Sequence, residues 1–344
     1  MGRVSTVAEK RKNATIHDVA ASAGVAVGTV SRYLNGQTVR QGNRLAIERA
    51  IEQLSFQRNA LAKAMKSETT DVIGFLTPII DEFHAELLNH LVRQFRHGGR
   101  TMLTYCHDDD GKLLREALSF FAKQRVDALV VAGSGHFTPD IETLVERGLP
   151  IVVYNNDLTG LGVDRVFVEN ANAAFRAVSH LVDVGHRRIA TAYGLQSQSS
   201  GVQRLEGYRR ALEAHGLAVD PAYMHPGNWG EEGGYSAVQK FMALAEPPTA
   251  IFSANYKMTV GILEWVREHG LRVPADLAIV SFDDVELFRL YDGGITAVKQ
   301  PIDKIAESIV SYVLSRLSGN ELPEIRTRTL DCNVILRGSS GYVG

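Results

Sequence analysis

The chain contains 344 residues, of which 45% are hydrophobic and 22% are charged, and its formal net charge is −2. This length is too great for one compact core, so two or three domains are expected. The composition is that of an ordinary soluble protein. No stretch approaches the ~20 apolar residues of a membrane-spanning helix, which excludes a transmembrane protein.

The charge is distributed unevenly along the chain. Residues 1–68 carry eleven basic and five acidic residues, a net charge of +6, whereas the remainder carries 26 basic and 34 acidic residues, a net charge of −8. A basic N-terminal segment on an acidic body indicates a polyanionic partner that binds this segment alone.

The two cysteines, Cys106 and Cys332, are too few for a disulfide framework in so long a chain, and we expect both to be reduced. The polar, basic N-terminus lacks the apolar run of a signal peptide, which predicts a cytoplasmic protein. We find no Ser-His-Asp set, metal-ligand spacing or G-x-G-x-x-G loop. No catalytic residue, metal or cofactor is therefore expected.

Residues 15–36, TIHDVAASAGVAVGTVSRYLNG, have the pattern of a helix-turn-helix. Thr15 followed by Asp18 predicts a capping box at the start of the first helix, and Gly24 permits the left-handed backbone of a tight turn. A second helix is expected over residues 27–34. Such a helix lies in the major groove of DNA. Periodicity alone leaves an ordinary helical hairpin open.

The pattern of apolar residues changes at Asp71. Before it, a third helix is expected at residues 43–54. Residues 59–66 are rich in helix-forming residues, but this segment is too short to be a stable helix alone. After it, short apolar runs alternate with amphipathic stretches, which predicts two parallel sheets covered by helices, as two Rossmann-like lobes with a cleft between them. The runs lie at residues 72–76, 102–105, 128–132, 151–154, 189–193, 250–253 and 278–282.

The letters AGV…TVSRYLN closely resemble the DNA-binding headpiece of the LacI/GalR family of bacterial transcription regulators. The likeness continues in SHLVDVGHRRIA (179–190), RLEGYRRAL (204–212), PPTAIFSAN (247–255) and VPADLAIVSFDD (273–284). The resemblance implies an all-α helix-turn-helix headpiece followed by an α/β effector domain like the type I periplasmic sugar-binding proteins, whose chain crosses between the lobes three times. It also implies a homodimer. No heptad repeat follows Arg337-Gly338-Ser339, so a coiled-coil tetramer is not expected.

The expected domain boundaries follow from the resemblance. The headpiece spans 1–58, the hinge helix and linker span 59–70, and the effector domain spans 71–340. Within the effector domain, the N-lobe is expected at about 71–168 and 300–326, and the C-lobe at about 169–299 and 327–340.

The resemblance also assigns the residues that contact DNA. Val27 and Gly28 occupy the positions that discriminate bases, and Arg32 can pair bidentately with guanine. Met65 stands where relatives carry the leucine that wedges into the minor groove, although it could merely close a local apolar contact. Further DNA contacts are expected from Thr15, His17, Thr29, Ser31, Asn35 and Asn59.

Three departures from the family pattern concern this headpiece. Ala26 replaces the usual serine at the start of the second helix, which removes a cap worth ~1 kcal/mol. Val27 and Gly28 offer few side-chain atoms that can contact bases, so sequence specificity is expected to depend more on Arg32 and on DNA shape. Arg58 replaces a proline before the hinge helix, which adds a possible phosphate contact and loosens the turn.

The effector site is expected from five residues that match the family's ligand contacts. An indole can stack on a sugar ring, and amide, carboxylate and guanidinium groups can bind hydroxyl or carboxylate oxygens. The residues are Phe83, Arg204, Trp229, Asn255 and Asp283. Each alone is also compatible with a structural role, Trp229 as core and Arg204 as a surface ion pair.

Departures in this site affect the expected ligand. Tyr256 replaces an aspartate, Asn155-Asn156 replace Asp-Arg, and His84 adds a donor. Because an acid is lost while Arg204 is kept, we expect a sugar acid or another oxyanion-bearing carbohydrate rather than a neutral hexose.

Together these observations predict a DNA-binding repressor of carbohydrate or sugar-acid uptake and catabolism genes, controlled by a small molecule in the cleft. Its expected partners are near-palindromic operator DNA, the effector and a second copy of the chain. A carbohydrate-binding module for transport is the alternative, but it leaves the +6 headpiece unexplained. An enzyme is not expected.

Overall fold

The computed structural model describes residues 14–34, 36–56, 69–133, 139–158, 160–319 and 324–341. The chain divides into two units, Met1–Thr70 and Asp71–Gly344. The expected hinge helix lies outside the described residues, and so do four residues of the sequence analysis, Asn35, Arg58, Asn59 and Met65.

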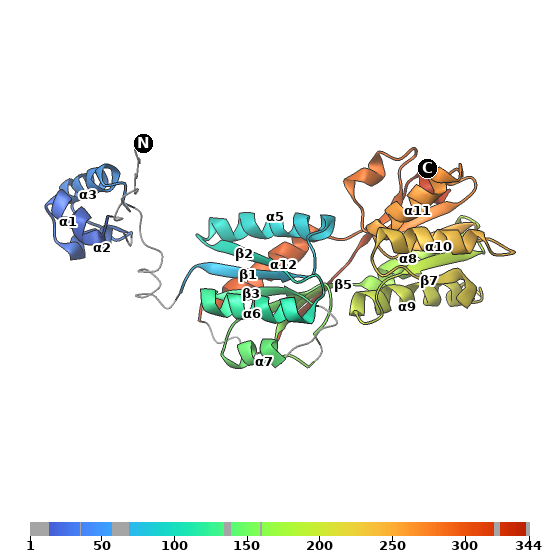
Figure 1. Cartoon of the computed structure of the whole chain (residues 1–344), viewed down its shortest axis with the longest axis horizontal. Helices are drawn as coiled ribbons and strands as arrows, with labels where there is room; N and C mark the ends of the chain where they lie inside the picture. Colours follow the sequence, from blue (N-terminus) through green and yellow to red (C-terminus); the bar gives the residue numbers. More distant parts are fainter. Residues whose placement is uncertain are drawn as a thin grey trace, which may run out of the picture. The chain divides into compact units, whose positions relative to one another are not determined.

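The first unit contains the predicted helix-turn-helix, α1 (Ile16–Ala23) and α2 (Val27–Leu34), followed by α3 (Gln41–Gln53) (Figure 1). The capping box is present at Thr15, and Gly24 adopts a left-handed φ of 65° in the turn. Both features are local, which is why sequence reasoning found them. The three helices enclose a small core of Val19, Ala20, Val30, Ile47 and Ala50.

The second unit contains two six-stranded sheets, ordered β11-β5-β4-β3-β1-β2 and β12-β10-β9-β8-β6-β7. Neighbouring strands are parallel, except for the antiparallel pair of β10 and β12. The strands of the first sheet are β1 (Val72–Thr77), β2 (Thr101–Cys106), β3 (Ala128–Ala132), β4 (Ile151–Tyr154), β5 (Asp164–Val168) and β11 (Thr327–Leu330). Those of the second are β6 (Ile189–Tyr193), β7 (Met224–Pro226), β8 (Ala250–Ser253), β9 (Ala278–Phe282), β10 (Thr296–Lys299) and β12 (Asn333–Ile335).

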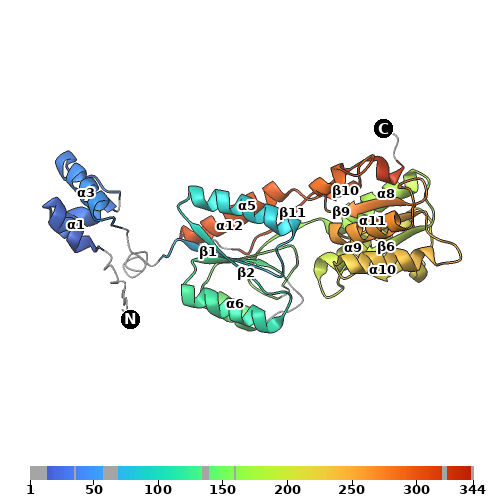
Figure 2. The ribbon, with the colours of Figure 1, turned by 45° about the horizontal axis from the view of Figure 1, so that its top comes forward.

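Helices cover both faces of each sheet, which confirms the two Rossmann-like lobes. In the first lobe α5 and α12 pack together on one face, with α6 and α7 on the other; in the second, α8 pairs with α9 and α10 with α11 (Figures 1 and 2). Each of the seven predicted apolar runs is a strand in the structure. They were recognisable because a strand that is buried on both faces appears in the sequence as a continuous run of apolar residues. The helices are α5 (Glu82–His97), α6 (Gly111–Gln124), α7 (Pro139–Glu146), α8 (Asn170–Asp183), α9 (Ser199–Ala214), α10 (Glu231–Met242), α11 (Tyr256–Glu268) and α12 (Ile302–Leu317).

The chain passes between the lobes three times, after β5, after β10 and after β11. The third crossing corrects the expected boundary at 326, because β11 pairs in parallel with β5 and belongs to the first lobe. Arg326, just before β11, donates to Asp164 at the start of β5, so contacts distant in sequence decide where this strand pairs. The crossing falls between Leu330 and Asn333.

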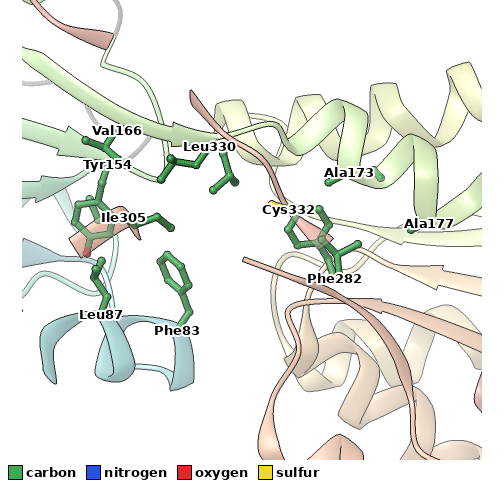
Figure 3. Close-up of a cluster of buried hydrophobic side chains, with 14 of the residues drawn as sticks. Phe83, Leu87, Tyr154, Val166, Ala173, Ala177, Phe282, Ile305, Leu330 and Cys332 are labelled. Atoms are coloured by element: carbon green, nitrogen blue, oxygen red, sulfur yellow. The ribbon is translucent and has the colours of Figure 1, made fainter. Parts of the chain in front are cut away.

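One buried apolar cluster extends through the crossings from lobe to lobe. Tyr154 and Ile305 belong to it on the first lobe, and Phe282 on the second, while Leu330 and Cys332 lie between them (Figure 3). The two cysteines are unpaired. The crossings are therefore part of the packed core.

Candidate functional site

The described residues of the expected DNA-binding set lie on the surface of the headpiece. Thr15, His17, Gly28 and Arg32 are exposed, and the other three, Val27, Thr29 and Ser31, are half-buried. They occur at the start of α1 and along α2, whose inner face is anchored by the fully buried Val30. The outer face of α2 is therefore available to a partner.

The start of α2 shows the consequences of two sequence departures. The carbonyl of Ala26 accepts hydrogen bonds from the backbone N–H groups of Thr29 and Val30, at 2.8 and 3.3 Å, but alanine has no side-chain oxygen to cap the helix. A Cβ placed on Gly28 would have no heavy atom within 4 Å. The position that the resemblance assigns to base reading is therefore open.

In the second unit, a cavity of about 490 Å³ lies between the two lobes. All five expected effector residues line it: Phe83 from α5, Arg204 from α9, Trp229 before α10, Asn255 before α11 and Asp283 after β9. Ligands of parallel α/β sheets bind at the carboxyl ends of the strands, where these residues lie. The fold thus brings together side chains that are up to 200 positions apart in sequence.

The cavity wall also contains most of the non-glycine residues with left-handed backbone in the described ranges. Nine non-glycine residues in the described ranges have positive φ. Six of the nine line the cavity, namely Asp108, Asp109, Asn155, Asn228, Trp229 and Asp283. Positive φ in a bulky residue such as Trp229, at 64°, is rare and costs energy, and such strain concentrates at functional sites.

Arg204 is buried and held by the protein itself. Its Nε donates to Asn170 Oδ1 at 2.9 Å and its Nη1 donates to the carbonyl of Ala254 at 2.7 Å, while the guanidinium lies 3.6 Å from the ring centre of Phe282. Asp283 Oδ2 is 3.7 Å from Nη1, and Asp283 Oδ1 accepts a hydrogen bond from Gln300 at 2.7 Å. Burial raises the pKa of Asp283 although Arg204 and Gln300 oppose this.

Trp229 is positioned by its neighbours Gly194 and Asn255. Its indole lies over Gly194, where a Cβ would come within 2.0 Å of the ring, so only glycine allows this approach. Asn255 Nδ2 donates to the carbonyl of Trp229 at 3.1 Å, and Asn255 Oδ1 caps α11 by accepting from Met258 N. The amide of Asn255, expected to bind hydroxyls, is thus largely engaged in positioning Trp229 and α11.

Hydrogen bonds join the lobes across the cavity wall. Asn156 of the first lobe donates to Gln198 at 3.4 Å and accepts from Ser200 N at 2.9 Å, and Gln198 accepts from Trp229 Nε1 at 2.8 Å. Sequence reasoning missed Gln198. No local pattern marks it, since its partners lie about 30 to 40 residues away in the chain.

Two pocket residues also connect to the crossings between lobes. Arg204 bonds to Asn170, which begins α8 directly after the first crossing, and Asp283 bonds to Gln300, which lies in the second. Sequence reasoning did not single out Gln300 either. Arg204 and Asp283 therefore connect the cavity to two of the three segments that join the lobes.

A helix-turn-helix headpiece followed by a two-lobed domain with an interlobe cavity defines a DNA-binding regulator with a small-molecule site. Residues 15–59 match the sequence model of bacterial regulatory proteins of the lacI family, and residues 178–340 match that of a periplasmic binding protein-like domain. The HTH-type transcriptional repressor CytR of Escherichia coli K12 is 31% identical, covering 95% of this chain and 96% of its own. The ribose operon repressor of Haemophilus influenzae is 30% identical, covering 95% and 98%.

Solved structures agree with this relationship. The complex of the transcriptional regulator CelR with cellobiose is 28% identical with a TM-score of 0.73, covering 95% of this chain and all of the other. The lac repressor dimer bound to operator and ONPF is 22% identical with a TM-score of 0.85, covering 96% and 99%, and shows the shared fold. The chain belongs to the lacI family of bacterial regulatory proteins. It is a DNA-binding transcriptional regulator, and the relatives are named as repressors rather than enzymes.

Two further features bear on the class of site. No helix in the described ranges is long and apolar enough to cross a membrane. Within the same ranges, no group of three or more His, Cys, Asp or Glu side chains is arranged to hold a metal ion.

Proposed function

We propose that the chain is a cytoplasmic, homodimeric repressor that binds a near-palindromic operator through α2 of each subunit. A small carbohydrate-like effector in the interlobe cavity controls this binding. The observation that carries the proposal is a pair of hydrogen bonds at two interlobe crossings, one that Arg204 donates to Asn170 and one that Asp283 accepts from Gln300, because they give a cavity ligand a route to the lobe orientation. The names of the relatives, two repressors and a cellobiose complex, support the same reading.

On the DNA side, Val27, Gly28 and Arg32 are proposed to read bases. Thr15, His17, Thr29, Ser31, Asn35 and Asn59 are proposed to contact the DNA backbone, which positions the headpiece without reading sequence. Met65 is proposed as the minor-groove wedge of a hinge helix within 59–70. The headpiece would then be 1–58 and the effector domain 71–340.

On the effector side, the ligand is proposed to stack on Trp229 and to contact Phe83, Arg204, Asn255 and Asp283. Its binding is proposed to shift the lobes, and the hinge helices proposed within 59–70 are too short to be stable without pairing on DNA. A coupling of a few kcal/mol is therefore enough to change operator occupancy substantially. Two-fold symmetry of the protein requires two-fold symmetry of the operator.

Footprinting of the purified protein on sheared genomic DNA, with and without a carbohydrate mixture, tests the proposal. We expect enrichment of a short palindrome beside transport or catabolic genes, changed by the mixture. The Arg32→Ala variant is the matched control, and it should lose roughly 1–3 kcal/mol of affinity at the base it contacts. Absence of any enriched palindrome would contradict the proposal.

A further inference from the structure

The N-termini of two helices from opposite lobes are in contact beside the cavity. The backbone N–H of Glu82, the first residue of α5, donates to the hydroxyl of Tyr256, the first residue of α11, at 3.3 Å. α5 belongs to the first lobe and α11 to the second (Figure 2). The two residues are 174 positions apart in the sequence, so this contact exists only because of how the lobes are placed.

The charges on the two helix ends are complementary. The N-terminus of a helix carries a partial positive charge, so two such ends repel each other unless acidic groups lie between them. α5 supplies two acids, Asp81 at its N-cap and Glu82 in its first turn. α11 has no acid in its first turn and carries Lys257 there, a position where a cation is unfavourable in an isolated helix.

The compensating charge for Lys257 comes from the opposite lobe. Although burial opposes ionisation of Asp81, its hydrogen bond to His84 and the charges of His84 and Lys257 lower the pKa of this carboxyl. Asp81 and Lys257 both line the cavity. Their attraction therefore acts between the same two helix ends as the hydrogen bond from Glu82 to Tyr256.

We infer that Asp81, Glu82, Tyr256 and Lys257 form an interlobe clasp, which holds the lobes together independently of any effector and sets how often they separate. The clasp needs no ligand because all of its groups belong to the protein. Tyr256 is not among the residues that line the cavity, and it acts through Glu82 as a positioning residue. The consequence of the clasp for DNA binding rests on the proposed function.

A second contact between the lobes provides a way to detect their separation. The backbone N–H of Ser200 donates to Asn156 Oδ1 at 2.9 Å, and that of Asp157 donates to Ser199 Oγ at 2.9 Å. Each of these amides has its acceptor on the other lobe, so it loses this hydrogen bond when the lobes separate. Hydrogen exchange at Ser200 and Asp157 therefore reports the separation.

Tyr256→Phe tests the clasp, because it removes the accepting hydroxyl and keeps the ring. In the full chain, hydrogen exchange at Ser200 and Asp157 should become roughly threefold to tenfold faster, as expected for the loss of one hydrogen bond. If the amide of Glu82 alone exchanges faster, the contact is local and the inference is overturned. Exchange at Val130, fully buried in β3, should be unchanged, which excludes a general loss of stability.

Tyr235→Phe is the matched control. The hydroxyl of Tyr235 donates to Glu268 at 2.7 Å, and both residues belong to the second lobe. The same chemical change therefore removes a hydrogen bond within one lobe, and exchange at Ser200 and Asp157 should stay as in the parent. An equal increase in both tyrosine variants would also overturn the inference.

Lys257→Gln tests the attraction between the helix ends. At low salt, Ser200 and Asp157 should exchange a few-fold faster than in the parent. At high salt this difference should shrink, because salt screens the attraction between charges that are only partly buried. A difference that is independent of salt would exclude the charge of Lys257 from the clasp.

Failure of this inference is distinguishable from failure of the proposed function, because the exchange measurements need neither operator nor effector. If Tyr256→Phe speeds exchange at Ser200 and Asp157 but leaves affinity for the footprinted operator unchanged, the clasp stands and the control of DNA binding by lobe orientation is wrong. If exchange at these amides does not change, the clasp is wrong, whatever happens at the operator.

Discussion

The indole of Trp229 donates at 2.8 Å to Gln198 of the same lobe, and Gln198 in turn contacts the opposite lobe. The accepting oxygen also receives a hydrogen bond from Asn156, a residue of the first lobe that is only 2% exposed. A ligand stacked on Trp229 is therefore two hydrogen bonds away from the other lobe. This relationship leads to the first prediction.

Gln198→Met keeps the length of the side chain and removes both hydrogen bonds. We expect the effector to bind within a few-fold of its usual affinity, while its effect on operator affinity falls by a large part of the 1–3 kcal/mol typical of allosteric coupling. Operator titrations at zero and saturating effector measure this difference. Equal coupling in variant and parent would remove Gln198 from the route between the lobes.

Gly28→Ala tests the open position at the start of α2. Nothing lies within 4 Å of the new Cβ, and alanine favours a helix over glycine, so the headpiece should gain up to about 1 kcal/mol of stability. The added methyl should also alter which bases are preferred in the operator. Thermal melting and selection from a randomised half-site report the two effects. A loss of stability would show that the site is less open than described.

Ala26→Ser restores a side-chain oxygen where the backbone carbonyl already accepts from Thr29 and Val30. We expect the headpiece to be stabilised by about 0.5–2 kcal/mol, as for other N-cap serines. Ala26→Val, which offers no cap, is the matched control and should not stabilise. If both variants melt alike, the start of α2 does not need a cap.

Asp164 supports the first lobe at the start of β5. Its fully buried carboxylate pairs with Arg316 and Arg326, and although burial opposes ionisation, these partners lower its pKa to about 2. Because this pKa is depressed, the contribution to stability is present above the ordinary value near 4 and is lost as the pH falls towards 2. By linkage it amounts to about 2 kcal/mol.

Asp164→Asn should therefore lower the free energy of unfolding of this lobe by about 2–4 kcal/mol at pH 7, since two arginines lose their partner. The difference between variant and parent should shrink on acidification below pH 4. Denaturant unfolding at pH 7 and pH 3 checks both statements. A difference that stays constant with pH would contradict the assignment to the ionised carboxylate.

The sequence by itself determined the elements whose causes are local. The capping box of Thr15, the left-handed Gly24 and the apolar stripe of α2 all lie within a few residues, and so do the buried strands from Val72 onward. Local spacing fixes such features because each interaction closes within one or two helical turns or one strand. The five cavity residues came from matched positions, and the fold indeed gathers them in one cavity.

Only the tertiary structure decided what those residues are able to do. Arg204 alone was also compatible with a surface ion pair, yet it is buried and held by Asn170 and the carbonyl of Ala254, which lie 34 and 50 positions away. β11 was expected in the second lobe, yet it pairs with β5 across more than 150 residues. A side chain's chemistry depends on which of its hydrogen-bonding atoms are already satisfied, and long-range packing sets that.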